Sequence, residues 1–554
     1  MDISRTSDVW WKNAVFYCLD VETFQDGNGD GIGDFVGLAR QVDYLAGLGV
    51  TCLWLMPFYP SPNRDDGYDI IDYYSVDPLL GNMGEFVEFV RTARDRGMRV
   101  IADLVVNHTS KEHPWFKSAR SDRNSPYRDW YIWSDEIPEG GPSDLVFPDK
   151  ENSNWEWDEE AGQYYLHRFY KHQPDLNIAN PKVREEIRRI VGFWLEIGLS
   201  GFRVDAVPFL LETSGIERPM EIAPHDWLRD LRSFLGRRRG DAVLLGEVNL
   251  EYEAVRRFFG DESGDELHMC LNFNLNQALA LVREDAGALV HNLRAMPSLP
   301  ADAAWANFIR NHDEWSLDKL TEAERQEVFR AFGPKEDMQL FGRGLRRRLP
   351  TMLNGNQARI RMAYSLAFAL PGAPVLFYGE EIGMAENLEI PGRMSVRAPM
   401  QWTTGPNGGF STAPPDELCR PVVESKRWGP PKVNVADQQR DGDSLLNWME
   451  HLIRRRRETP EIVFGAWSLV PVPQAAILAL RHDWGERSVL TIHNLSGKSH
   501  RISFNPGQVA SHGLVDLFGD GSFAVEKDGT VTIEVGGYDY RWFRIPRTDA
   551  DTPA

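Results

Sequence analysis

The chain has 554 residues, a formal net charge of −21, 42% hydrophobic residues and 11% aromatic residues. This length is more than one ordinary hydrophobic core needs and predicts two or three domains. The composition is that of a folded globular protein. The excess of acidic groups argues against nucleic acid or an anionic membrane surface as the partner, and it is compatible with a neutral substrate such as a sugar.

The four cysteines lie far apart and form no CxxC motif. Cys18 and Cys52 fall inside apolar, strand-like runs, so we expect buried free thiols and a reducing compartment. Residues 1–8 contain no apolar signal core. The longest apolar region, 362–378, is interrupted by proline and glycine, which predicts a helix, a turn and a strand rather than a membrane span. A cytoplasmic protein is expected.

Strand-like apolar runs alternate with amphipathic helical segments along most of the chain. In chain order, strands are expected at residues 14–21, 50–56, 99–106, 200–206, 242–248, 268–273, 306–310 and 374–378. Helices are expected at 35–48, 85–96, 181–197 and 358–370. This alternation predicts an α/β fold, a (β/α)₈ TIM barrel, whose active sites lie at the C-terminal ends of the strands.

Two regions depart from the barrel pattern. Residues 107–180 form too long an interval for a βα loop and predict an inserted subdomain B after strand 3, between barrel segments 1–106 and 181–460. Beyond residue 460, short alternating runs are separated by Gly, Asn, Asp and Pro. They predict a C-terminal antiparallel β-sandwich domain over 461–554.

Three acids each end a strand-like run: Asp205, Glu247 and Asp313. Opposed carboxylates at strand ends are what glycosidic bond cleavage needs, because one protonates the leaving oxygen while another attacks or stabilises the reacting carbon. Arg203, two residues before Asp205, would keep that acid ionised, as a nucleophile must be. For any one of the acids taken singly, the alternative is an unrelated strand-capping residue.

The motifs around these acids resemble those of the α-amylase family of retaining glycoside hydrolases and transglycosylases. They are Gly-Tyr-Asp at 67–69, Asp-Leu-Val-Val-Asn-His at 103–108, Gly-Phe-Arg-Val-Asp-Ala at 201–206, Gly-Glu-Val at 246–248, Arg-Asn-His-Asp at 310–313 and Pro-Met-Gln-Trp at 399–402. They span the expected barrel in the family's order, so the set is far more specific than any single motif.

The resemblance implies roles for residues at matching positions. Asp205 would be the nucleophile, Glu247 the general acid/base, and Asp313 the third carboxylate, which binds sugar hydroxyls. The implied substrate-binding residues are Tyr68, stacking beneath the sugar, His108 and His312, hydrogen-bonding to it, and Arg203, orienting the nucleophile.

The resemblance also implies that Asp65 pairs with Arg397 and closes the pocket around a terminal glucose, as in relatives that act on chain ends. Such a pocket would admit short α-glucosides rather than long polymers. The alternative is a purely structural ion pair.

Within the family the chain is most similar to the trehalose synthase and α-glucosidase-like members. The first similarity implies conversion of maltose to trehalose by transfer of a glucosyl unit through a covalent glucosyl-aspartate. The runner-up is α-glucosidase- or α-amylase-type hydrolysis. Cys18 and Asp20 stand where this group has Glu and His, which puts the isomerase specificity in doubt. A non-catalytic scaffold or transporter subunit, the rival of another class, would lack one of the acids. The sequence leaves the oligomeric state open.

Residues 26–34 place oxygen-bearing side chains at alternate positions in a glycine-rich turn, as in the first part of a calcium-binding loop. The resemblance implies a structural Ca²⁺ site, and no organic cofactor. The implied ligands are Asp26, Asn28, Asp30, the Ile32 carbonyl and Asp34. The alternative is an acidic turn without metal.

Overall fold

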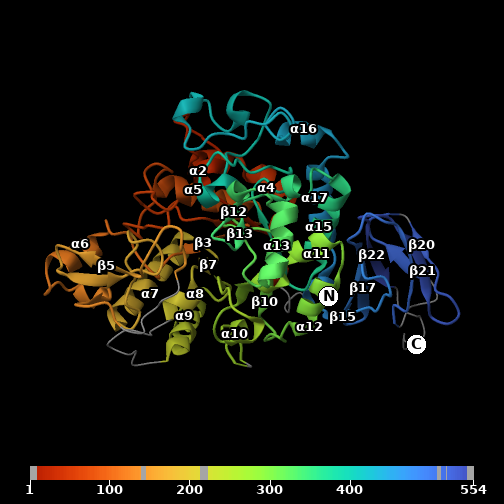
Figure 1. Ribbon diagram of the computed structural model, residues 1–554, viewed down its shortest axis with the longest axis horizontal. Coiled ribbons are helices and arrows are strands. Elements are labelled where there is room, and N and C mark those ends of the chain that lie inside the picture. Colours follow the sequence, from red (N-terminus) through yellow and green to blue (C-terminus); the bar gives the residue numbers. More distant parts are fainter. Residues whose placement is uncertain are drawn as a thin grey trace.

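The computed structural model describes residues 9–138, 145–211, 223–261, 263–507, 513–519 and 521–545. Within these residues, eight parallel strands close into a barrel in the order β1-β14-β10-β9-β8-β7-β3-β2 (Figure 1). Each overlaps one of the expected runs, which confirms the TIM barrel. The strands are β1 (Phe16–Leu19), β2 (Cys52–Leu55), β3 (Arg99–Leu104), β7 (Gly201–Val204), β8 (Val243–Gly246), β9 (Met269–Leu271), β10 (Ala304–Phe308) and β14 (Ala373–Phe377).

The barrel strands are buried on both faces, because side chains fill the barrel and helices cover its outside. Every residue of β1, β2, β7 and β8 is buried. The register places Asp103 of β3 beside Arg203 of β7, and Val204 beside Gly246 of β8. The polar residues that end these strands are therefore brought to one rim of the barrel.

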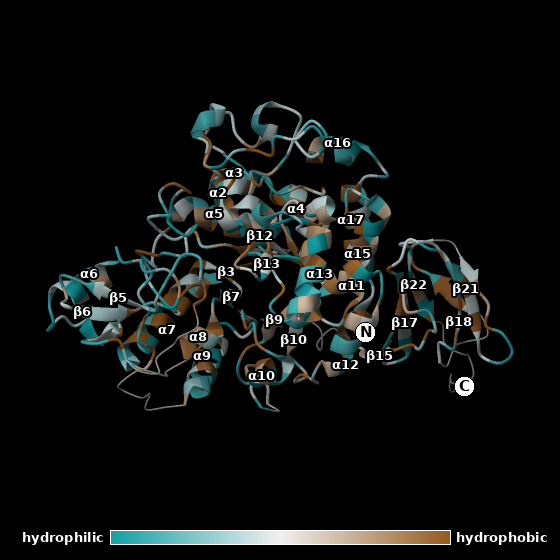
Figure 2. Ribbon diagram, viewed as in Figure 1, coloured by the Kyte–Doolittle hydropathy of each residue, from teal (hydrophilic) through white to brown (hydrophobic). Residues whose placement is uncertain are grey.

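The helices begin where the sequence provides caps. Asn82 and Glu85 form a capping box at the start of α5 (Met83–Asp95), and Asn180 caps α7 (Pro181–Ile197). The helix expected at 35–48 is divided into α3 (Phe35–Arg40) and α4 (Val42–Leu48), because the chain leaves helical geometry at Gln41. Figure 2 shows hydrophilic and hydrophobic residues on the same helices around the barrel, as expected for amphipathic segments.

Three segments extend the barrel rim. Between β3 and α7 lie α6 (Pro114–Ser121) and a sheet of β4 (Trp133–Ser134), β6 (Gln163–Leu166) and β5 (Trp155–Asp158). Between β10 and α15 (Gln357–Ala369) lie α13 (Glu322–Phe332) and short strands, including β13 (Gly344–Leu345). The segment 378–434 follows β14 and includes the 3₁₀ helix η5 (Gly392–Val396), which contributes to the site described below.

The C-terminal region packs beside the barrel, at the right of Figure 1. It follows α17 (Leu445–Arg457) and α18 (Pro460–Phe464). Its described residues form a sheet in the order β15-β16-β17-β22-β19-β20 and a pair, β18-β21. Leu490, Ile492, Ile502 and Phe504 are buried between these strands, and the strand pairs are antiparallel, which confirms the predicted β-domain. The strands are β15 (Ala466–Leu469), β16 (Ile477–Trp484), β17 (Arg487–Asn494), β18 (His500–Phe504), β19 (Leu514–Asp516), β20 (Ser522–Phe523), β21 (Val531–Val535) and β22 (Tyr540–Ile545).

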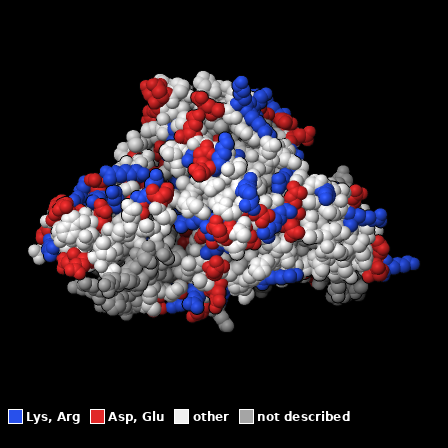
Figure 3. All heavy atoms as spheres, in the orientation of Figure 1, with Lys and Arg blue, Asp and Glu red and all other residues white. Residues whose placement is uncertain are grey.

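The described part of the chain contains no helix long and apolar enough to cross a membrane. All four cysteines are free thiols, and Cys18, Cys52 and Cys270 are buried, as expected for the first two from the sequence. Figure 3 shows acidic and basic side chains interspersed over the visible face of the molecule.

Candidate active site

Arg203 occupies the centre of the rim, with a fully buried side chain. Its Nη1 donates to Asp205 Oδ1 over 2.6 Å and to Asp103 Oδ1 over 2.8 Å. Its Nη2 donates to Glu247 Oε2 over 2.8 Å. One guanidinium therefore holds acids from three adjacent strands, and it fixes the expected nucleophile relative to the expected acid/base.

The backbone turns sharply after the expected nucleophile. Ala206 has a φ of 49°, a left-handed conformation that residues with a side chain rarely adopt. The turn directs the Ala206 N–H at Glu247 Oε2, 3.1 Å away, and the Val207 N–H at the Glu247 carbonyl, 3.2 Å away. Strain in this turn is thus coupled to the placement of the acid/base.

Burial controls the protonation of these acids. It raises the pKa of Asp205 to about 6, although the charge of Arg203 opposes the rise. It also raises the pKa of Glu247, again against Arg203. Because one guanidinium serves three carboxylates, Arg203 limits the rise in pKa rather than producing a low value. At neutral pH Asp205 is still mainly ionised, and the shift in Glu247 favours the protonated form that a general acid needs.

The third acid lies in a hydrogen-bonded cluster at the end of β10. His312 Nε2 is 3.1 Å from Asp313 Oδ2 and 2.7 Å from the Tyr68 hydroxyl. That hydroxyl donates to Asp103 Oδ2 over 2.9 Å, and the Tyr68 ring stacks on the His312 ring at an interplanar angle of 11°. Asp103 thus connects this cluster to Arg203.

The two histidines expected to bind the sugar are both buried. His108 Nε2 lies 3.2 Å from the Tyr68 carbonyl oxygen. Burial lowers the pKa of His108 and of His312, so both rings are neutral near pH 7. Neutral imidazoles offer one donor and one acceptor each, which suits hydrogen bonding to uncharged hydroxyls.

The expected pair of Asp65 with Arg397 is wrong. Asp65 Oδ1 accepts from Arg393 Nη2 over 2.6 Å, and Arg397 instead donates to Asp66. Both arginines also donate to Asp313 Oδ1, Arg393 over 2.8 Å and Arg397 over 3.1 Å. The two arginines lie at different depths: Arg397 is fully buried, whereas Arg393, four residues earlier in η5, keeps 14% of its side chain exposed, and each reaches a different acid of the Asp65–Asp66 pair.

These arginines determine the charge of Asp313. Burial by itself would raise its pKa, but the hydrogen bond from His312 and the positive charges of Arg393 and Arg397 outweigh that effect and hold the pKa well below its ordinary value. Asp313 is therefore ionised at neutral pH and keeps its charge to a lower pH than Asp205 does.

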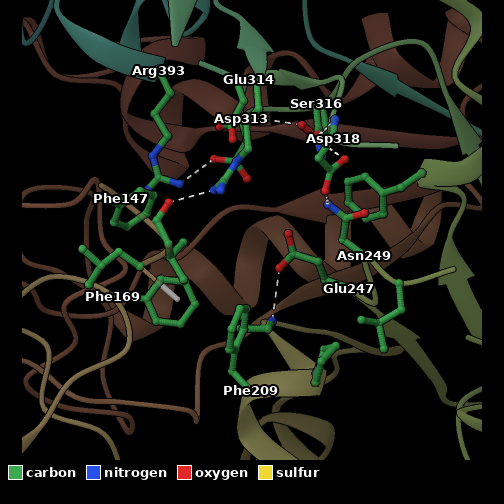
Figure 4. Close-up of a pocket in the computed structure, with 18 residues that line it drawn as sticks. Phe147, Phe169, Phe209, Glu247, Asn249, Asp313, Glu314, Ser316, Asp318 and Arg393 are labelled. Atoms are coloured by element: carbon green, nitrogen blue, oxygen red, sulfur yellow. Dashed lines mark hydrogen bonds and ion pairs between the residues drawn. The ribbon is translucent and has the colours of Figure 1, made fainter. Parts of the chain in front are cut away.

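A cavity of about 550 Å³ opens beside this cluster (Figure 4). Its size is typical of a small-molecule site. Phe147 and Phe169 reach it from the segment inserted after β3, and the Arg393 guanidinium lies 5.2 Å from the centre of the Phe147 ring. Figure 4 shows Arg393 beside Asp313, with Glu247 approaching from another strand. Apolar rings combined with a few convergent charged groups fit a sugar, which has both faces and hydroxyls to bind.

Sequence reasoning named neither Arg393, Asp66 nor Asp103 as part of the site. Asp103 belongs to the 103–108 motif and pairs with Arg203 through strand register, so the motif contained that signal. The four-residue spacing of Arg393 and Arg397, facing the Asp65-Asp66 doublet, could have suggested two ion pairs instead of one.

The loop at residues 26–34 is closed by its own hydrogen bonds. Asp26 accepts from the N–H groups of Asn28, Gly29 and Gly31 and from the Ser411 hydroxyl. Asp34 accepts from Gly27 and Gly37. Among the described residues, no three His, Cys, Asp or Glu side chains are grouped as ligands of one metal ion. The amide and carbonyl oxygens of Asn28 and Ile32 are compatible with calcium, and calcium binding here stays a prediction.

A parallel barrel whose strand ends bring together Asp205, Glu247 and Asp313, the first two of them bonded to Arg203, defines a carbohydrate-active barrel enzyme. The chain belongs to the α-amylase family: the alpha amylase catalytic domain family matches residues 21–465. Residues 486–544 match the sucrose hydrolase-like C-terminal domain family.

Similar proteins cover almost the whole chain. A trehalose synthase of Pimelobacter sp. (strain R48) is 38% identical, over 98% of this chain and 96% of its own length. A trehalose synthase/amylase of Mycobacterium tuberculosis is also 38% identical, over 98% of this chain and 92% of its own length. Among solved structures, the trehalulose synthase of Pseudomonas mesoacidophila MX-45 superposes with a TM-score of 0.76 at 27% identity, over 97% of this chain and 99% of that one.

Proposed function

We propose that this enzyme interconverts maltose and trehalose by transferring a glucosyl unit through a covalent intermediate on Asp205. The observation that supports the chemistry best is the shared guanidinium: Arg203 lies 2.6 Å from Asp205 and 2.8 Å from Glu247. It holds the two acids in fixed orientation while their environments differ. The similarity to trehalose synthases over nearly the full length supports the choice of substrate.

In the first step, an Asp205 carboxylate oxygen attacks the anomeric carbon of the terminal glucose, and Glu247 gives its proton to the departing glycosidic oxygen. The products are a β-glucosyl ester on Asp205 and a free glucose. In the second step, Glu247 takes the proton from the anomeric hydroxyl of the retained glucose, whose oxygen attacks the same carbon and releases Asp205. Two inversions restore the α configuration of the transferred glucosyl unit, and attack by the α-anomer of the retained glucose gives the α,α-linked disaccharide.

The pocket supports short substrates that enter by their non-reducing end. Asp65, Arg393 and Asp313 are joined by ion pairs of 2.6 and 2.8 Å, and Arg397 adds a fourth group behind them. We expect this charged wall to block a glucan chain from continuing past the terminal sugar. We infer that Arg393, rather than Arg397, is the partner of Asp65 in closing this end.

Hydrolysis is the second candidate, and one relative's name, trehalose synthase/amylase, favours keeping it. The cavity of about 550 Å³ has room for water beside a sugar ring. If water reaches the glucosyl-aspartate before the retained glucose reorients, the products are two glucose molecules. Transfer therefore requires that the site exclude water during the second step.

The test is to incubate the protein with maltose and separate trehalose from glucose by chromatography. The proposal predicts trehalose as the main product and glucose as the minor one. Glucose alone would select the hydrolase, and unchanged maltose beside a cleaved aryl α-glucoside would point to another natural substrate. Asp205→Asn serves as the inactive control.

Two further assignments belong to the proposal. Ca²⁺ in the loop 26–34 would join Asp26, Asn28 and Asp30 and stiffen a turn next to β1, without a part in bond cleavage. A cytoplasmic location is supported by the free thiols, three of them buried, in a chain without a disulfide. Recovery of the protein from a fractionated cell with the cytoplasmic contents tests the location.

A further inference from the structure

Behind the pocket wall lies a second arginine–carboxylate cluster, formed by Arg420 with Asp20, Glu22 and Asp66. Arg420 belongs to the segment after β14, far along the chain from the strand ends, and its side chain is 9% exposed. Its Nη1 donates to Asp20 Oδ2 over 3.0 Å, at the end of β1, and its Nη2 donates to Asp66 Oδ1. Glu22 lies 3.7 Å from the same guanidinium.

This cluster holds Arg397 at two points. The Asp66 carboxylate bridges the two arginines, accepting from Arg420 through Oδ1 and from Arg397 through Oδ2. Arg420 Nη1 also donates to the Arg397 backbone carbonyl over 3.1 Å. Neither the backbone nor the guanidinium of Arg397 can shift without breaking one of these bonds.

Arg397 in turn contacts Asp313, one of the expected catalytic acids. Its Nε donates to the His312 carbonyl over 2.8 Å, and its Nη2 donates to Asp313 Oδ1 over 3.1 Å. A continuous series of buried contacts therefore runs from Arg420 through Asp66 and Arg397 to Asp313. Arg397 is fully buried and Asp66 has 2% of its side chain exposed, so water does not screen these contacts.

Two features of the sequence fit this arrangement. Asp66 has a φ of 53°, a left-handed conformation that Asp and Asn tolerate better than other non-glycine residues. Asp20, which directly follows β1, supplies the carboxylate that fixes the other side of Arg420. The pair Arg420–Asp20 thus anchors the segment after β14 to the end of β1.

We propose that Asp66 and Arg420 are positioning residues, which hold Arg397 against Asp313 and so shape the subsite for the terminal sugar. Neither residue contacts the reacting groups; both act through Arg397. Only the identity of the bound sugar rests on the proposed function, because the position of Arg397 does not depend on which substrate the enzyme uses.

The test compares Asp66→Asn, Arg420→Met and the double variant with the parent protein. Asn keeps the left-handed turn and removes the charge. A matched control is Asp516→Asn, since Asp516 is a buried acid that pairs with Arg541 over 3.0 Å in the C-terminal sheet, away from the site. Each protein is measured for kcat and KM on maltose and for melting temperature.

We expect each single variant to lower kcat/KM about tenfold or more, mainly through KM because a substrate-binding contact is misplaced. The double variant should lose little more than the worse single variant, since both act through one residue. Arg420→Lys should recover part of the activity, as the ammonium keeps the charge but makes fewer directed bonds. Asp516→Asn should have a lower melting temperature and an unchanged KM.

The proposal would be overturned if the single variants kept kcat/KM within twofold of the parent. It would also be overturned if the losses in kcat/KM of the two single variants added fully in the double variant. If Asp66→Asn does not fold, the kcat/KM of Arg420→Met decides by the twofold criterion. Crystal structures of the variants test this proposal independently of the proposed function. The Arg397–Asp313 contact should be lost in them, whatever the substrate of the enzyme is. If that contact persists, Arg420 and Asp66 do not position Arg397.

Discussion

Arg203 joins Asp205 to Glu247: its two terminal nitrogens donate to the two carboxylates over 2.6 and 2.8 Å. A proton gained by either acid weakens its bond to the shared guanidinium and strengthens the other bond. The charge of Asp205 also raises the pKa of Glu247, so the protonation of the two acids is linked. This coupling suits a reaction in which one proton alternates between Glu247 and the substrate while Asp205 alternates between carboxylate and ester.

Replacing the expected nucleophile tests its role directly. Asp205→Asn keeps the shape of the side chain and removes its charge, so turnover of maltose should fall by about 10⁴-fold or more. The measurement is the rate of maltose consumption, with circular dichroism to verify folding. Retention of parental rates by a folded variant would exclude Asp205 as the nucleophile.

The same variant should gain stability at neutral pH. The folded-state pKa of Asp205, about 6, is above the ordinary 3.8, so its ionised form costs stability, and the cost appears as pH rises from about 4 to above 6. By linkage the cost at pH 7 is about 1–3 kcal/mol. Denaturant unfolding of both proteins should show a larger advantage for Asp205→Asn at pH 7 than at pH 4. An equal difference at both pH values would contradict the burial cost.

Activity should fall on the acid side with an apparent pKa near 6. Burial raises the pKa of Asp205 to about 6, and protonation below that pH removes the nucleophile. Maltose does not titrate, so the pH profile of kcat/KM reports the free enzyme. A profile that stays flat down to pH 4.5 would show that the acid limb belongs to a group of lower pKa.

Removing the pocket wall should change substrate preference. Arg393→Ala breaks contacts to Asp65 and Asp313, and Arg397→Ala breaks contacts to Asp66 and Asp313. Both variants should lose kcat/KM on maltose by more than the effect of an exposed ion pair, which is worth only about 0–1 kcal/mol. The parent should prefer maltose strongly over soluble starch. Rapid mid-chain cleavage of starch by the parent, with long oligosaccharides appearing first, would mean that the cleft is open.

The strand pattern and the motifs predicted the barrel and the placement of its acids, because hydrophobic periodicity is local and each acid lies soon after a strand. Asp205 and Glu247 directly follow β7 and β8, and Asp313 lies in the motif that follows β10. The pairing of Asp65 with Arg393 was not predictable in the same way, since it depends on where the segment after β14 crosses the rim. The contact between Arg420 and Asp66 joins residues 354 positions apart, and no local pattern specifies it. The sequence did not predict the division of helix 35–48 at Gln41, because the amphipathic periodicity continues across the break.

Calcium removal should loosen the region around β1 rather than stop the chemistry directly. The loop 26–34 bonds to the segment after β14 through Asp26 N to Phe410 O and Cys419 N to Gly31 O, next to Arg420. Chelation should therefore lower the melting temperature and, through Arg420, raise KM. Metal analysis should give one calcium per chain. Absence of bound calcium together with an unchanged melting temperature would contradict the site.

The central claim is glucosyl transfer within a closed pocket, and isotope labelling tests it most directly. Maltose is converted in the presence of excess ¹³C-labelled glucose, and the trehalose formed is analysed by mass spectrometry. Transfer to the retained glucose predicts trehalose with almost no label. Trehalose labelled in proportion to the external glucose would show that the first glucose leaves, and free glucose without trehalose would show that water, not sugar, completes the reaction.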